Sequence, residues 1–120
     1  MSEKLVIMAT HASDDPERAT IPFVLATAAQ ATDVDVSIGL QVDGVTLACK
    51  GGADNIQAPD FPPLRDLLDA YLEAGGEIYV CGPCAKSRHI TPEDLLPGAS
   101  IVSAATFVIE FTEATNVLVY

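Results

Sequence analysis

Apolar and polar positions along the chain follow two spacings, one typical of strands and one typical of helices. Residues 5–9 form a continuous apolar run, which indicates a strand buried on both faces of a parallel sheet. Residues 34–40 alternate between apolar and polar or small side chains, which predicts a second strand. Further strands are predicted over 77–81, 100–102 and 116–120, and the last of them is expected to end the chain inside the sheet.

Helical spacing links these strands. Residues 17–31 carry a broad apolar stripe, and Pro22 favours a helix that begins near Ala19 or Ile21, because a proline is tolerated only in the first turn. The clearest helical pattern starts at Leu64 and is closed by the pair of glycines at 75–76.

Shorter segments complete the pattern. A helix is predicted to start near Cys84, and another over 104–114, where apolar residues recur at spacings of three and four. Residues 91–98 have the composition of a helix of about two turns that starts on a proline. Residues 45–48 fit either a short helical turn or an edge strand, and residues 50–55 predict a mobile loop.

Strands alternating with helices predict an α/β fold. We expect a three-layer, mostly parallel sheet with helices on both faces, in a single domain of residues 1–120. Because ligands of such sheets bind beyond the carboxyl ends of the strands, the loops over 10–15, 41–55 and 81–88 are expected to share one rim.

Composition and charge narrow the range of possible functions and partners. The hydrophobic share of 49% and the mean hydropathy of +0.31 are high for 120 residues, which favours apolar surface buried between subunits. The net charge of −11 opposes binding to the phosphate backbone of nucleic acids. The apolar run at 5–10 is too short to span a bilayer or to direct export, so we predict a cytoplasmic protein without a membrane partner.

The cysteines are the strongest chemical signal. Cys49, Cys81 and Cys84 are an odd number in a reducing compartment, which argues against a disulfide framework. Cys81 and Cys84 form a C-x-x-C whose Gly-Pro centre brings two sulfurs together where a strand meets a helix. Either thiol could instead be a buried small hydrophobe, and Cys49 is interpreted as structural.

Basic residues follow this pair. Lys86 and Arg88 are expected to lower a thiol pKa from its usual value of about 8.5, which would yield a nucleophilic thiolate. His89 could add charge or carry a proton, and His11 could reach the rim as an acid–base group or remain a solvated loop residue.

The sequence lacks the residue patterns that are typical of metal and cofactor sites. One C-x-x-C with His11, His89 and Cys49 gives no second paired spacing for zinc, and the glycine motifs of phosphate and dinucleotide loops are missing from the sequence. We therefore predict no metal and no cofactor.

The chain resembles the DsrE-like sulfur-relay family, which includes DsrE, DsrF and TusD-type subunits. The resemblance covers nearly the whole chain. It is carried by THASDDPERATIPFVLATAAQA over 10–31, Asp43-Gly44-Val45 with Lys50-Gly51, EAGGEIYVCGPCAKSRHI over 73–90, and SAATFVIEFTEATNVLVY over 103–120.

This resemblance implies a flavodoxin-like fold that assembles as a homotrimer or homohexamer. It also implies an intracellular sulfur carrier or sulfurtransferase, which relays persulfide sulfur from a donor protein to an acceptor protein. Cys81 matches the sulfur-carrying cysteine of the family, and Arg88 matches an arginine of its pattern. His89 stands where the family usually has glycine, and Cys84 is an addition to the single-cysteine subunits.

The second thiol leaves other functions open. Cys84 could resolve a persulfide on Cys81 into a disulfide and release sulfide, which would make the pair a thiol-redox or regulatory module. The pair could also sense oxidants through a sulfenic acid, or hold a metal or cluster at a subunit interface. A third hypothesis is a non-catalytic oligomer that binds a small ligand at the rim.

Overall fold

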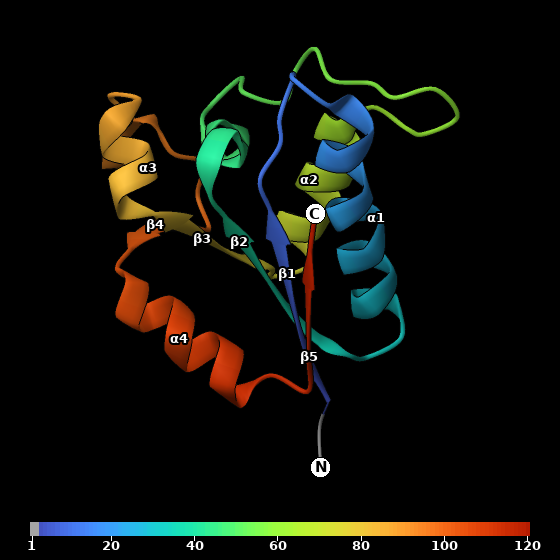
Figure 1. The fold of residues 1–120 in the computed structure, drawn as a ribbon. Helices are drawn as coiled ribbons and strands as arrows, with labels where there is room; N and C mark the ends of the chain where they lie inside the picture. Colours follow the sequence, from blue (N-terminus) through green and yellow to red (C-terminus); the bar gives the residue numbers. More distant parts are fainter. Residues whose placement is uncertain (1–2) are drawn as a thin grey trace.

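Five parallel strands form one sheet in the computed structural model, which describes residues 3–120 (Figure 1). Their order across the sheet is β4-β3-β2-β1-β5, and each neighbouring pair is parallel. The strands are β1 (Lys4–Ala9), β2 (Asp35–Leu40), β3 (Glu77–Cys81), β4 (Ala99–Val102) and β5 (Asn116–Val119). The predicted terminal strand is thus part of the sheet, and because β5 pairs with β1 alone, it lies at an edge.

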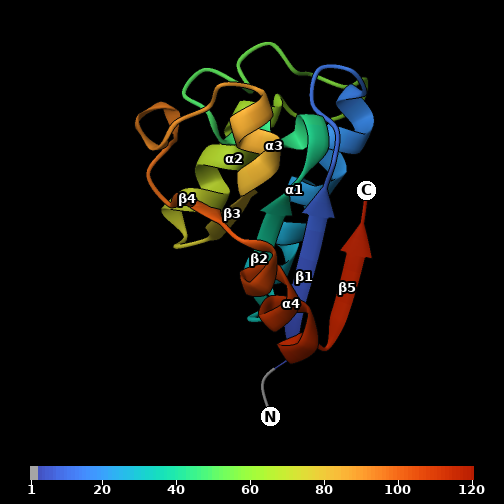
Figure 2. The ribbon, with the colours of Figure 1, turned by 60° about the vertical axis from the view of Figure 1, so that its left-hand side comes forward.

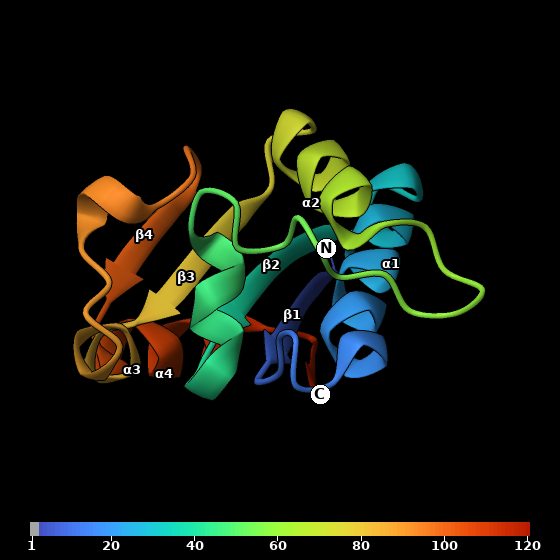
Figure 3. The same cartoon turned by 90° about the horizontal axis from the view of Figure 1, so that it is seen from above.

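Helices cover both faces of this sheet. They are α1 (Pro16–Ala31), α2 (Leu64–Glu73), α3 (Gly82–Ser87) and α4 (Ala104–Glu113), with the short 3-10 helices η1 (Val42–Ala48) and η2 (Pro92–Asp94). Figures 2 and 3 show α1 and α2 together on one face and α4 on the other. The right-handed crossover rule explains this, because the step from β4 back to β5 runs in the opposite direction to the steps from β1 to β2 and β3. The predicted α/β fold with helices on both faces is confirmed.

Two hydrophobic clusters follow from the alternation of side chains along the strands. Ile7 and Ala9 of β1 face the larger cluster, which α1 and α2 cover, whereas Val6 and Met8 join Phe107 of α4 in the smaller one. Cys81 is partly buried and packs against both clusters. It therefore lies where the two layers of the core meet.

The start of α1 differs from the prediction. The helix begins at Pro16, because the carboxylate of Asp15 accepts a hydrogen bond from the Arg18 N–H at 3.1 Å and caps the first turn. Pro22 consequently lies inside the helix, where it is buried. The predicted start near residues 19–21 is wrong, since the cap outweighs the proline.

Shorter segments follow the predictions in part. Residues 42–48 form a helical turn, as one of the two alternatives stated. The loop over 50–55 is present, and Ala53 anchors it in the core with 3% of its surface exposed, while its mobility stays a prediction. α3 starts at Gly82, two residues before Cys84. Residues 91–98 contain only a single 3-10 turn, because Leu95 already returns to extended backbone.

Candidate functional site

The C-x-x-C lies at the carboxyl edge of the sheet. β3 ends at Cys81, which is paired in register with Val102 at the end of β4. From these neighbouring ends the chain leaves in different directions, upward into α3 and down one face of the sheet into α4 (Figure 1). Such a divergence is where parallel α/β sheets most often bind ligands.

The two thiols of this site lie near each other, Cys81 at the N-cap of α3 and Cys84 in its first turn. Both cysteines are free and partly buried. Burial raises the pKa of Cys81 above its ordinary value, and the nearby Cys84 thiol raises it further. The predicted juxtaposition of the two sulfurs is therefore present.

A backbone amide from η1 completes the contacts of Cys84. The N–H of Val42 donates a hydrogen bond to Cys84 Sγ at 3.3 Å. Val42 has a φ of +55°, which a β-branched residue rarely adopts, although 50% of its surface is exposed. The sequence pattern did not reveal Val42, because the interacting group is its backbone and the nearest signal was the Asp-Gly turn that follows.

Arg88 ties α3 to η1 beside the thiols. Its guanidinium donates to Asp43 Oδ1 from Nη2 at 2.8 Å and from Nε at 3.3 Å, and Nη1 donates to the Cys84 carbonyl at 3.1 Å. The ion pair with Asp43 offsets much of the positive charge of Arg88 that was expected to act on the thiols. Arg88 still favours the Cys81 thiolate slightly, but it is the smallest of the influences on that thiol.

The predicted lowering of the thiol pKa is therefore wrong for Cys81. Burial of the Cys81 side chain disfavours the thiolate more strongly than the Arg88 charge favours it. Lys86 is exposed in the last turn of α3. The site consequently relies on hydrogen-bond donors more than on free cationic charge.

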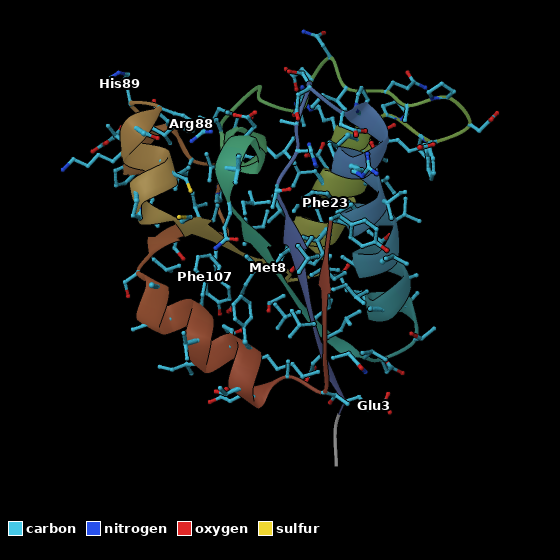
Figure 4. All side chains as sticks on the ribbon, viewed as in Figure 1. Glu3, Met8, Phe23, Arg88, His89 and Phe107 are labelled. Atoms are coloured by element: carbon cyan, nitrogen blue, oxygen red, sulfur yellow. The ribbon has the colours of Figure 1, made fainter. Side chains whose placement is uncertain are left out.

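The two histidines lie away from the thiols. His89 is exposed at the outer end of α3 and points away from the protein body (Figure 4). His11 follows β1, two strands from β3, and its Nδ1 lies 2.7 Å from Asp14 Oδ2. A hydrogen bond from the Ala12 N–H and the bond with His11 lower the pKa of Asp14. The structure brings neither predicted histidine to the cysteine pair.

Cys49 belongs to another part of the fold. It follows η1 and forms an isolated antiparallel bridge with Leu95. Burial raises the pKa of its thiol, and the nearby Asp94 carboxylate raises it further. This position agrees with the structural interpretation of Cys49.

Potential metal ligands are scattered over residues 3–120. Within that range, the His, Cys, Asp and Glu side chains form no group of three or more that could hold a metal ion. The helices of the same residues are too short or too polar to cross a bilayer.

Comparison with known proteins adds to this geometry. The family model described as the DsrE/DsrF-like family matches residues 3–120. The chain belongs to the DsrE/DsrF-like family. The predicted family resemblance is thereby confirmed.

Relatives of this DsrE/DsrF-like chain occur in Methanopyrus kandleri and Methanocaldococcus jannaschii. The uncharacterized protein MK0008 of Methanopyrus kandleri is 32% identical over 117 residues, which cover 97% of this chain and 93% of that protein. The uncharacterized protein MJ0760 of Methanocaldococcus jannaschii is 36% identical over 105 residues, which cover 88% of this chain. The match spans only 38% of MJ0760, so that relative is much longer than the present chain.

Solved structures share the DsrE/DsrF-like fold. The YchN protein of E. coli superposes with a TM-score of 0.82 at 23% identity, covering 98% of this chain and 99% of YchN. The protein MTH1491 of Methanobacterium thermoautotrophicum gives a TM-score of 0.72 at 16% identity, with 99% and 100% covered. These likenesses show the fold.

The backbone at His89 suits the glycine that the family resemblance predicts at this position. His89 is the first residue beyond the cap of α3 and has a φ of +58°, in the left-handed region that glycine adopts without cost. A glycine here would end the helix without strain, whereas His89 adopts the same backbone with strain.

We expect His89→Gly to raise the free energy of unfolding by about 0.5–1 kcal/mol, because it removes the Cβ from a left-handed backbone. Urea denaturation of the purified variant measures this change. His89→Ala is the matched control, since it keeps the Cβ and should give no such gain. Equal stability of the Gly and Ala variants would contradict the explanation.

Proposed function

We propose that this DsrE/DsrF-like protein carries sulfane sulfur as a persulfide on the Cys81–Cys84 pair, as a cytoplasmic sulfur carrier or sulfurtransferase. The observation that supports the proposal most is the proximity of two free thiols at the carboxyl edge of β3, in a chain of this family. A thiolate attacks the outer sulfur of a donor persulfide, and a second thiolate on an acceptor protein later removes that sulfur.

Assembly and partners are part of the same proposal. We propose a homotrimer or homohexamer that exchanges sulfur with separate donor and acceptor proteins. Exposed apolar side chains on two C-terminal elements support self-association: Val108 and Ile109 on α4, and Val117 and Val119 on β5. With a net charge of −11, a basic surface on the partner would accelerate docking.

The same proximity of the thiols favours a second candidate, a thiol-redox module. A Cys81 thiolate that attacks the inner sulfur of a Cys84 persulfide would form the intramolecular disulfide and release HS⁻, so the persulfide itself is the oxidant. This function would leave the protein without bound sulfane sulfur at the end of the reaction.

Intact mass spectrometry separates the two candidates. Incubation of the purified protein with glutathione persulfide, without reductant, is expected to add one sulfur, roughly 32 Da, that dithiothreitol removes. Cys49→Ser should gain the same mass, whereas the double variant Cys81→Ser/Cys84→Ser should gain none. A loss of about two hydrogens without a sulfur adduct would favour the redox module, and uptake by the double variant would overturn both.

A further inference from the structure

Resting on the proposed function, we propose that Cys84, and not the family-matched Cys81, is the thiolate that accepts sulfur first. The Val42 amide donates a hydrogen bond to the Cys84 sulfur, and Cys81 acts as the second thiol of the pair.

The contacts of the two sulfurs are unequal. Cys84 Sγ accepts the Val42 N–H at 3.3 Å, from an element that is 42 residues away in the sequence. A backbone N–H can only donate, so this contact stabilises a sulfur that bears negative charge. The contact comes from outside α3 and therefore does not depend on the start of that short helix.

Cys81 has the environment of a protonated thiol. It packs against both hydrophobic clusters, and its burial favours the neutral form. The neighbouring Cys84 side chain acts in the same direction, because it also raises the pKa of Cys81. Negative charge on both of two neighbouring sulfurs is disfavoured, and the N–H donor from η1 lies at the sulfur of Cys84.

The Val42 amide is held in place by the surrounding structure. A φ of +55° at a β-branched residue costs about 1–2 kcal/mol, so the neighbouring contacts must impose it. Asp43 next to it binds Arg88, and its carbonyl accepts the Thr46 hydroxyl at 2.9 Å. Gly44 sits directly against the Ala9 carbonyl. Strain of this kind, at a residue whose N–H meets a thiol, is typical of a functional site.

The first step is a thiolate exchange at the sulfur of the donor. The Cys84 thiolate attacks the outer sulfur of a donor persulfide R–S–SH and forms a new S–S bond. The S–S bond of the donor breaks, and R–S⁻ leaves with the electron pair. The product is Cys84–S–SH, and Cys81 keeps its proton throughout, so no further oxidant or reductant is needed.

Competitive alkylation tests the order without any sulfur donor. The full chain is treated briefly with limiting iodoacetamide, and the labelled cysteines are identified by peptide mass mapping. We expect Cys84 to react about tenfold faster than Cys81, which corresponds to a difference of about 1.4 kcal/mol. Cys49, partly buried and away from the site, serves as the internal reference. Faster labelling of Cys81 would overturn the assignment.

Sulfur uptake by single variants separates this inference from the proposed function. With glutathione persulfide, Cys81→Ser is expected to gain one sulfur and Cys84→Ser to lose rapid uptake. Uptake lost only in Cys81→Ser would refute the order and leave the carrier function standing. Absence of uptake in wild type would refute the carrier function, and the alkylation order would still decide which thiol is the nucleophile.

The alkylation rate of Cys84 in Val42 variants tests the role of Val42 as a positioning residue. In a Cys81→Ser background, Val42→Pro removes the N–H and is expected to slow alkylation of Cys84 across the pH profile. Val42→Gly is the matched control, because it keeps the N–H and adopts a φ of +55° without strain. An unchanged rate in a folded Val42→Pro variant, or a rate lost equally in Val42→Gly, would show that this amide does not act on the sulfur.

Discussion

Replacing Gly44 by alanine is expected to lower the free energy of unfolding by about 3 kcal/mol. A Cβ at this position would lie 2.2 Å from the Ala9 carbonyl oxygen and 2.9 Å from its carbonyl carbon. Both atoms belong to the backbone of β1, inside the sheet, so neither can rotate away. The alternative is displacement of η1, which would also move the Val42 amide from Cys84.

The measurement is urea denaturation, combined with the alkylation rate of Cys84. Gly75→Ala is a suitable control, because Gly75 has a φ of +88° and a Cβ there would meet nothing within 4 Å. That variant carries only the backbone cost, about 1–2 kcal/mol, and should leave Cys84 unaffected. A smaller loss for Gly44→Ala than for Gly75→Ala would contradict the steric argument.

Tyr71→Ala is expected to cost about 3–5 kcal/mol of stability, the range for removing a large buried aromatic side chain. Tyr71 of α2 is fully buried, and its ring meets Phe23 of α1 edge to face, with centroids 6.0 Å apart. Gly76 lies against the same ring. Loss of the ring would open a cavity between α1, α2 and the sheet, and thermal or urea unfolding would show it directly.

Tyr71→Phe separates the hydroxyl from the ring. The hydroxyl donates to the Glu77 carbonyl at 2.6 Å, so its removal should cost about 1 kcal/mol. Burial raises the pKa of this hydroxyl, and it stays protonated through the neutral range, so the cost should not change with pH. If Tyr71→Phe lowered the free energy of unfolding as much as Tyr71→Ala does, the hydrogen bond, and not the packing of the ring, would dominate the contribution of Tyr71.

Much of the fold could be predicted from the sequence because short local patterns of apolar residues and turn residues mark its strands. The predicted bounds of β3, residues 77–81, agree with the structure, since a run of apolar residues is closed by glycine on one side and Gly-Pro on the other. The start of α1 was missed because two local signals compete, the Asp15 cap and Pro22. Their balance depends on the burial of Pro22 in the folded protein, which no local pattern reveals.

Of the candidate site, only the residues that act through their side chains could be predicted from the sequence. Cys81 and Cys84 are close in the sequence, so their proximity followed from a tight bend. Arg88 was identified by type, but its partner Asp43 lies 45 residues earlier and offsets the expected effect of its charge. Val42 contributes a backbone atom, and any residue type except proline offers that atom.

The position of β1 between β2 and β5 governs the order in which the sheet can be assembled. Leu5 pairs with Val36 on one side and with Asn116 on the other, so the two sides of β1 find partners from opposite parts of the chain. As the chain leaves the ribosome, β1 to β4 with α1 and α2 can associate while one edge of β1 stays open. α4 and β5 then close that edge last, by a pairing between strands that lie far apart in the sequence.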